Sequence, residues 1–292
     1  MKNYQIGILD GETKLGRYMT FSIHSITNIA ATLISLKENI DSQFTVVGFG
    51  ESLITALGKE IPGLRTMPAQ SVGGIEIPST PQSLWIWLRG TDRGEILHRS
   101  RKIEAILADA FSITSVIDSF QFDKNRDLSG YEDGTENPEG DDALVAAIFS
   151  SEITEINGGS FVAVQQWLHD LDIFEQMDKE RQDNTFGRHA QSNDEFDAPS
   201  SAHVKRAAQE DFEPEAFMVR RSMPWADGMD SGLVFVSFAN NLDKFEAVMN
   251  RMIGKDDGII DALFDFTRPI NGAYYWCPPT RNGKLNLSSL GL

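Results

Sequence analysis

The feature that most constrains the fold is the order of strand and helix patterns, which repeats in the two halves of the chain. In the first half, alternating apolar runs predict strands near 18–23, 44–49, 83–88 and 114–122, and helical periodicity covers 28–39, a short stretch from 52, and 93–111. In the second half, the corresponding strands lie near 160–167, 216–221, 233–238 and 272–277, with helices over 171–186 and 242–253.

Each half therefore follows the order β-α-β and then β-α-β, which is typical of a ferredoxin-like unit with helices on one face of an antiparallel sheet. We predict an α+β protein built from two such units. The acidic loop 123–142 separates them, which gives an N-terminal unit over 1–140 and a C-terminal unit over 141–292. A ligand pocket is expected where the two units meet.

Composition narrows the functional classes. The 292 residues carry a net charge of −17, which argues against nucleic acid and anionic membrane surfaces as partners. One cysteine, Cys277, leaves no intrachain disulfide and no multi-cysteine zinc or iron–sulfur site. The chain shows neither a signal-peptide pattern nor an apolar run long enough to span a membrane, so a cytoplasmic protein is expected.

The segment Gly130-Tyr131-Glu132-Asp133-Gly134-Thr135-Glu136-Asn137-Pro138 is the strongest local signal of chemistry. Gly130 and Gly134 allow a positive φ and a close approach of the backbone to a bound group. A carboxylate on such a loop has a defined position, so Asp133 is the candidate acid–base residue, provided that a metal ligand and a cation come from elsewhere.

The histidines supply one candidate for that ligand. His24, His98, His169 and His189 fit surface or structural roles, whereas His203 follows the small-residue turn Ala198-Pro199-Ser200-Ser201-Ala202. A lone histidine suits a haem iron better than zinc, because haem needs one protein ligand on its proximal side.

Two further charged residues lie in apolar surroundings. Arg220 comes near the end of an apolar strand pattern, and an arginine pointing inward there needs an anion nearby. Asp265 stands between two phenylalanines in Leu263-Phe264-Asp265-Phe266, as either a helix cap or a buried acceptor. A metal-bound histidine usually donates its other ring N–H to such a carboxylate.

Together these segments resemble the dye-decolourising peroxidases, of the bacterial class called B. The family signature Gly-x-x-Asp-Gly matches Gly130–Gly134, and its usual continuation matches 135–138. The segments around His203, Arg220 and Asp265 resemble the proximal histidine, the distal arginine and the aspartate that meets the histidine. Gly187-Arg188 resembles the motif whose arginine approaches a haem propionate.

The resemblance implies haem b, held between the sheet and the helices of the second half, and peroxidase activity on hydrogen peroxide with dyes or phenolic and other aromatic donors. His203 would ligate the iron, Asp133 would move the proton, and Arg220 would stabilise developing negative charge and keep Asp133 ionised. The other cofactor-binding residues would be Arg188, Asp265, Gly134, Thr135, Phe235 and Ser222. Ser222 stands where relatives often have asparagine, and its hydroxyl reaches less far.

Two other functions remain open at this level. One is haem handling or release of iron from the porphyrin, which needs His203 but not Asp133 and Arg220. The other is a haem-free ligand-binding module of ferredoxin-like domains. A homodimer or larger homo-oligomer is expected. The small, apolar C-terminal tail 284–292 faintly resembles peptides that dock such peroxidases into a protein shell, although ordinary packing explains it better.

Overall fold

A closed antiparallel barrel forms the centre of the molecule. The computed structural model describes residues 2–11 and 13–292. Eight strands follow one another around the barrel in the order β7-β12-β2-β5-β1-β6-β9-β10, and pairing of β10 with β7 closes it. In chain order they are β1 (Leu15–Ile23), β2 (Thr45–Phe49), β5 (Leu84–Gly90), β6 (Phe111–Phe120), β7 (Ser160–His169), β9 (Met223–Asp227), β10 (Asp230–Ala239) and β12 (Ala273–Cys277).

The two halves of the chain contribute contiguous halves of the barrel. Strands β2, β5, β1 and β6 come from the first half, and β9, β10, β7 and β12 from the second. At each seam one residue pair is matched, Trp276 with Phe49 and Ser119 with Trp225. Short strands extend the edges: β8 (Val219–Arg220) pairs with β10, and β11 (Thr267–Pro269) pairs with β7.

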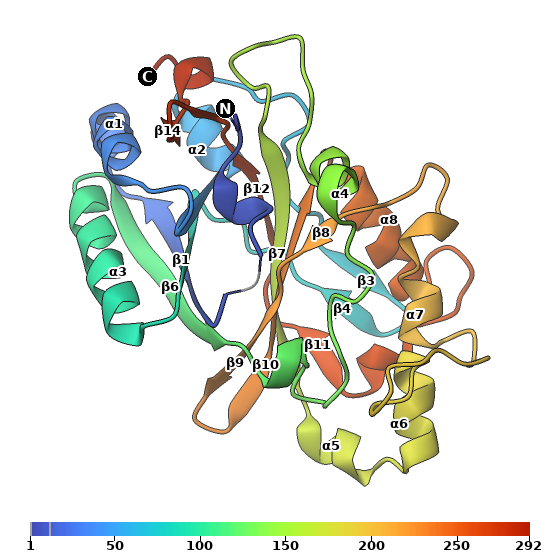
Figure 1. The fold of residues 1–292 in the computed structure, drawn as a ribbon. Helices are drawn as coiled ribbons and strands as arrows, with labels where there is room; N and C mark the ends of the chain where they lie inside the picture. The colour runs from blue at the N-terminus through green and yellow to red at the C-terminus, as the bar shows by residue number, and fades with distance from the viewer. Residues whose placement is uncertain (1, 12) are drawn as a thin grey trace.

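Helices cover the barrel on two sides (Figure 1). The helices α1 (Ile29–Asn39) and α3 (Arg93–Leu107) lie on one side, and α6 (Lys179–Phe186), α7 (His203–Arg206) and α8 (Asp243–Met252) lie on the other. The remaining helices are α2 (Glu51–Ala56), α4 (Gly140–Ala147) and α5 (Leu171–Gln176). Two small hairpins complete the fold, β3 (Gln70–Val72) with β4 (Ile75–Ile77) and β13 (Thr280–Arg281) with β14 (Lys284–Leu285).

Strand alternation produces two cores. Along β5, Trp85 and Trp87 point into the barrel, while Ile86 and Leu88 point outward to the helix-covered core. The barrel interior is unusually aromatic, and neighbouring strands add Tyr18, Phe238 and Tyr275 to it. The barrel is therefore a filled core and not a channel.

The elements expected from sequence are present, with local differences. The helix expected over 171–186 is two helices, because Asp178 accepts a hydrogen bond from the Arg181 N–H at 2.8 Å and starts α6 afresh. The strand expected over 216–221 shrinks to β8. The strand β9, the helix α4 and the hairpin of β3 and β4 were not predicted.

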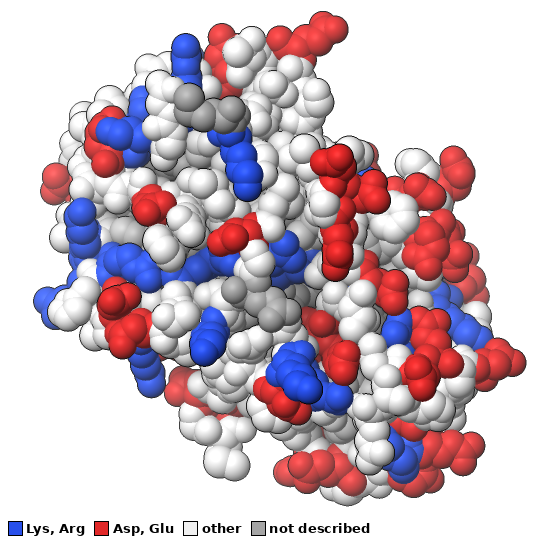
Figure 2. Space-filling model, in the orientation of Figure 1, with Lys and Arg blue, Asp and Glu red and all other residues white. Residues whose placement is uncertain are grey.

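Figure 2 shows that acidic side chains predominate on the side of α6 and α7, while a band of Lys and Arg crosses the other half of this face. Within the described part of the chain, no helix is both long and apolar enough to cross a membrane. Near the C-terminus, Leu285, Leu287 and Leu290 are buried in the main core, as the packing interpretation of the tail predicts.

Candidate active site

Two adjoining cavities open between the outer face of β7 and β10, the helices α7 and α8, and the loop that carries Asp133. Their volumes are about 130 Å³ and 430 Å³, and they share walls that include Asp133, His203 and Arg220. We call the two together the site cavity. Its inner part is apolar, with walls formed by Leu233, Phe235, Phe245, Val248, Met249, Met252 and Leu263.

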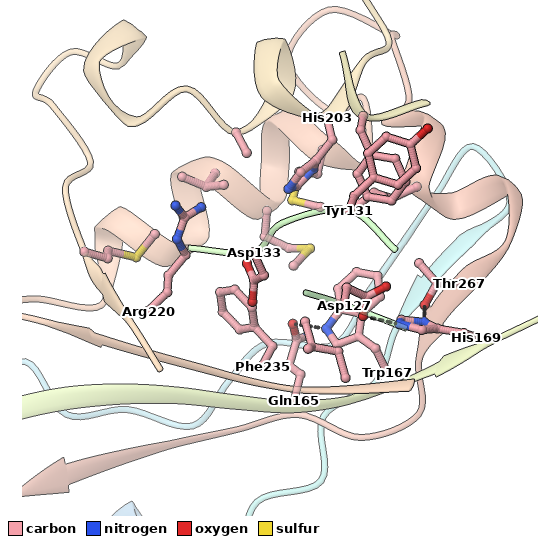
Figure 3. Close-up of a pocket in the computed structure, with 18 of the residues that line it drawn as sticks. Asp127, Tyr131, Asp133, Gln165, Trp167, His169, His203, Arg220, Phe235 and Thr267 are labelled. Atoms are coloured by element: carbon pink, nitrogen blue, oxygen red, sulfur yellow. Dashed lines mark hydrogen bonds and ion pairs between the residues drawn. The ribbon is translucent and has the colours of Figure 1, made fainter. Parts of the chain in front are cut away.

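His203 enters the site cavity from the first residue of α7 (Figure 3). Its Nδ1 lies 2.7 Å from Oδ2 of Asp261, whose side chain is fully buried. A carboxylate can only accept here, so Nδ1 is the donor of this bond, and Nε2 is the ring nitrogen left to bind a ligand in the cavity. The imidazole is thus oriented as a metal-binding histidine requires.

The sequence prediction named the wrong aspartate as the partner of His203. Asp261 starts a short 3₁₀ helix, where its Oδ1 accepts from the Leu263 N–H at 2.9 Å and its Oδ2 is left for His203. Asp265 ends that helix and pairs at 3.1 Å with Arg181, with half of its side chain exposed. One turn of helix therefore turns Asp265 away from the imidazole.

Asp133 and Arg220 lie on another wall of the cavity (Figure 3). The loop has the geometry that its glycines predict, with φ values of 87° at Gly130 and 75° at Gly134. Asn137 fixes the loop to β8, because its amide accepts from the Arg220 N–H at 2.8 Å and donates to the Arg220 carbonyl at 3.0 Å. Sequence reasoning missed this role of Asn137, although its place in the signature segment marked it.

The charge on Asp133 is less stabilised than the sequence suggested. Burial raises the pKa of the Asp133 carboxyl above its ordinary value, Arg220 opposes the rise, and the charge of Asp127 adds to it. No ion pair within 4.0 Å joins Asp133 to Arg220 among the described residues, and the buried Arg220 Nε has no partner there. Arg220 thus favours the ionised form of Asp133, but its effect is smaller than that of burial.

The described residues contain no cluster of three or more His, Cys, Asp or Glu that could hold a metal ion. The geometry thus offers one imidazole on one wall, an acid and a guanidinium on another, and an apolar space between them. This arrangement suits a flat cofactor that brings its own metal.

Comparison with known proteins decides the family. The family model for the C-terminal part of Dyp-type peroxidases matches residues 124–282, more than half of the chain. The chain belongs to the Dyp-type peroxidase family.

The relatives of this Dyp-type peroxidase agree with that assignment. It is 25% identical over 304 residues to a dye-decolorizing peroxidase of Mycolicibacterium paratuberculosis, covering 89% of this chain and 85% of the relative. It is 29% identical over 208 residues to a dye-decolorizing peroxidase of Rhodococcus erythropolis, covering 69% of this chain and 61% of the relative. A DypB variant of Rhodococcus jostii RHA1, solved in complex with heme, has the same fold, with a TM-score of 0.86, 24% identity, and 95% and 96% of the two chains covered.

As a Dyp-type peroxidase, the chain is an enzyme, a haem-dependent oxidoreductase that acts on hydrogen peroxide. The resemblance noted from sequence is confirmed at this level. The roles of individual residues rest on the geometry alone.

Arg188 of this Dyp-type peroxidase lies at the rim of the site cavity but is already engaged. Its guanidinium pairs with Glu136 at 2.8 Å and with Glu195, and it donates to the Asn193 carbonyl at 3.0 Å. Arg188 follows Gly187, whose φ of 82° ends α6. A cofactor carboxylate would compete with two protein carboxylates for this arginine.

The other predicted cofactor-binding residues divide between cavities. Phe235 lines the inner part of the site cavity, and Gly134 and Thr135 line its outer part. Ser222 lines a neighbouring cavity of about 270 Å³, which also touches Asp133 and Arg220. Its hydroxyl accepts from the Val236 N–H at 3.4 Å, so Ser222 borders the site without entering the main space.

A histidine that was set aside on sequence grounds also lines the cavity. His169 Nε2 lies 2.9 Å from Asp127 Oδ2, and its Nδ1 lies 2.6 Å from the Thr267 hydroxyl (Figure 3). Burial alone would raise the pKa of Asp127, but hydrogen bonds from His169 and Ser129 outweigh it and lower the pKa. Both ring nitrogens are engaged, so the structural interpretation of His169 holds.

Tyr131 anchors the signature loop on the opposite side. Its hydroxyl donates to Asp183, Lys179 donates to both groups, and its ring stacks on Phe186 at a centroid distance of 4.0 Å. The His189 Nδ1 lies 2.9 Å from the same Asp183 carboxylate. The loop that positions Asp133 is thus tied to α6 through Tyr131 and to β8 through Asn137.

Proposed function

We propose that the site cavity binds haem b, that His203 would hold its iron, and that Asp133 and Arg220 would drive the reduction of hydrogen peroxide from another wall of the cavity. The observation that carries this proposal is the pairing of a buried Asp261 with His203 Nδ1 at 2.7 Å, across an apolar space from Asp133 and Arg220. Haem iron, when bound, supplies the centre at which the O–O bond of peroxide breaks.

The residues that line the site cavity suit a bound haem. The inner walls are aliphatic, aromatic and methionine side chains, which favour a porphyrin face over water. The buried Arg220 Nε, which has no partner within the described chain, can donate to an anion or a peroxide oxygen. Arg188, at the outer rim, is the candidate partner of a propionate if Glu136 or Glu195 gives way.

The roles of the two distal residues follow from their charges. Asp133 takes a proton from the inner oxygen of peroxide and returns it to the outer oxygen, which leaves as water. Burial raises its pKa, so the carboxylate binds the proton more tightly once taken, and a smaller fraction of Asp133 is in the base form at acidic pH. Arg220 has a fixed charge that stabilises the outer oxygen as negative charge develops there.

The division of the fold and the partners are also proposed here. Numbered within its own half, each set of four strands has the same sheet order, fourth-first-third-second: β6-β1-β5-β2 and β12-β7-β10-β9. This shared order supports two ferredoxin-like units over 1–140 and 141–292. Dyes or phenolic donors as electron sources, a homo-oligomeric state and a cytoplasmic location remain predictions.

One experiment separates peroxidase action from haem handling. The chain is loaded with haem, one equivalent of peroxide is added, and both the visible spectrum and the release of free iron are followed. We expect a rapid spectral change with no iron released, and its loss in Asp133→Asn with haem content retained. Release of iron with metal-free porphyrin left behind would favour the haem-handling function, and a chain with no Soret band would favour the haem-free module.

A further inference from the structure

A separate cavity lies on the other face of the sheet, at a mouth of the barrel. Its volume is about 170 Å³, and none of the described residues that line it is charged. We call it the barrel-mouth cavity; its lining includes Tyr18, Thr20, Gln82, Trp85, Thr114, Ser115, Val164, Gln166, Asn271 and Tyr275. A dry engineered cavity of about 150 Å³ is known to hold a benzene ring, so this space is large enough for one small aromatic molecule.

The rim carries hydrogen-bond donors that the protein leaves unused. Gln82 accepts from Thr114 at 3.0 Å, and Gln166 accepts from Asn271 at 3.3 Å, so both amide oxygens are engaged. Neither side-chain NH₂ has a partner among the described residues, and both can donate into the mouth. At the floor, the fully buried Trp85 Nε1 also lacks a partner within the described chain.

A column of aromatic rings leads from this cavity toward the site. Tyr275 stacks on Trp85 at 5.9 Å, Trp85 on Tyr18 at 6.3 Å, and Tyr18 on Trp87 at 6.0 Å, with interplanar angles between 14° and 18°. Trp87 lines the cavity of about 270 Å³ that also touches Asp133 and Arg220. The column thus joins the two cavities through the barrel interior.

Gly48 makes part of this column possible. A side chain there would meet the Tyr275 Cβ at 2.8 Å and the Trp85 Cε3 at 3.2 Å, so glycine lets the two rings approach. Packing alone explains aromatic side chains in a barrel core. It does not require an uncharged mouth with free amide donors at the end of the column.

We propose that the barrel-mouth cavity binds a small neutral phenol and that the column carries its electron toward the site cavity. The absence of charged side chains favours a neutral ring, and the free NH₂ groups of Gln82 and Gln166 suit a hydroxyl oxygen. The electron route rests on the function proposed above, whereas binding of the phenol does not.

The redox step balances as one electron and one proton per phenol. Each phenol passes an electron along the column to the haem that peroxide has oxidised and releases its own proton to water at the mouth. Trp85 and Trp87 carry the charge, and the Tyr275 and Tyr18 rings bridge the gaps without being oxidised, so they keep their protons. Two phenols and one hydrogen peroxide give two phenoxyl radicals and two waters. Since Trp85 and Trp87 have no partner for their N–H groups, an oxidised indole finds no base nearby and its positive charge stays mobile.

A positively charged side chain near Trp87 sets the direction in which positive charge moves along the column. The Arg89 guanidinium lies 5.0 Å from the Trp87 ring centroid. A fixed cation disfavours a positive charge on that ring, so the charge moves on toward Trp85 and Tyr275, where the donor sits. Burial raises the pKa of Tyr18 and of Tyr275, so both phenols hold their protons at rest.

Binding is tested first, by calorimetric titration of the full-length chain with phenol in the absence of peroxide. Ser115→Phe places a ring in the mouth, and Ser112→Phe is its matched control on the same strand, exposed and outside the cavity. We expect saturable binding of phenol to the wild type and to Ser112→Phe, loss of binding in Ser115→Phe, and no binding of benzoate. Ser115→Val, a smaller plug, should weaken binding if Ser115→Phe does not fold.

Equal phenol binding in the wild type and the folded Ser115 variants would overturn the proposal, as would no binding to the wild type. The electron route has its own readout, the paramagnetic resonance signal of the haem-loaded chain after peroxide. We expect an aromatic radical that phenol quenches in the wild type and in Ser112→Phe, and that phenol quenches much less in Ser115→Phe. Equal quenching in all three would overturn the donor role, whereas a wild type that never reacts with peroxide would instead contradict the function proposed above.

Discussion

The Nδ1 of His203 lies 2.7 Å from the buried carboxylate of Asp261, while Asp265, four residues further on, faces Arg181 at the surface. A buried acceptor on the imidazole raises the basicity of the opposite ring nitrogen and favours the higher oxidation state of a bound iron.

The first prediction separates these two aspartates. Asp261→Asn should weaken haem binding or activity by about 10- to 100-fold and raise the Fe(III)/Fe(II) midpoint potential, because the imidazole loses its anionic partner. Asp265→Asn is the matched control and should leave both unchanged. Haem titration and spectroelectrochemistry measure the two quantities. A larger effect at Asp265 than at Asp261 would show that the partner of His203 is misassigned.

The second prediction concerns the proton shuttle. Asp133→Asn should slow the peroxide-driven spectral change by about 10²- to 10⁴-fold, because the amide cannot take the proton, while haem content stays the same. Glu139→Gln removes a carboxylate from the exposed end of the same loop and should have no effect. Stopped-flow absorbance gives the rates. Similar rates for Asp133→Asn and the wild type would remove Asp133 from the reaction.

The third prediction concerns the acid limb of the pH profile. Burial raises the pKa of Asp133, and Arg220 acts against that rise. The base form of Asp133 is lost as the pH falls through this raised pKa, so the acid limb of kcat/KM for peroxide should lie above the ordinary pKa of an aspartate. Arg220→Leu should move the limb to higher pH, and Arg220→Lys should move it less. A limb that stays in place in Arg220→Leu would contradict the coupling.

The fourth prediction concerns the position of Arg220. Asn137 holds the Arg220 backbone through two hydrogen bonds, so Asn137→Ala should free β8 from the loop. Misplacement by about 1 Å can cost up to about 100-fold in rate, and we expect a loss within that range with haem binding retained. Asn240→Ala, which removes an exposed amide elsewhere, is the control. An unchanged peroxide rate in Asn137→Ala would show that Arg220 needs no such support.

The fifth prediction concerns acid stability. Hydrogen bonds from Lys179, Tyr131 and His189 outweigh burial and lower the pKa of Asp183 to about 2. A carboxyl with a lowered pKa stabilises the fold above its unfolded pKa, and this contribution is lost as the pH falls toward about 2. It amounts to less than about 2 kcal/mol, because the Lys179 side chain is largely exposed.

Urea unfolding of the wild type and Asp183→Asn checks this linkage. The difference in free energy of unfolding should be present at pH 7 and should shrink as the pH approaches 2. A difference that does not change with pH would mean that the charge of Asp183 contributes nothing to stability.

Much of the fold could be predicted from hydrophobic periodicity, because a strand or helix that buries one face has apolar residues spaced to lie on that face. Periodicity did not predict the helix break at Asp178, which depends on a capping hydrogen bond, or the short strand β8, which depends on its pairing with β10. Closure of the barrel could not be predicted from periodicity either, because it depends on the pairing of β10 with β7, which lie far apart in the sequence.

Residues of the site could be predicted from sequence where the residue type, in its sequence context, has few possible roles. Asp133, His203 and Arg220 meet at one cavity as expected. The prediction of Asp265 as the partner of His203 was wrong, because the cap of the helix that places Asp261 against the imidazole cannot be read from the sequence. Asn137 and Tyr131 were missed as anchors, since their partners lie 83 and 52 residues away.

His203 is the proposed protein ligand of a haem iron in the site cavity. Its most direct test is the visible spectrum of His203→Ala loaded with haem, before and after adding imidazole, with His169→Ala as the control from the same cavity. We expect His203→Ala to lose the wild-type spectrum, imidazole to restore it, and His169→Ala to keep it. A wild-type spectrum in His203→Ala without imidazole would show that His203 is not the ligand.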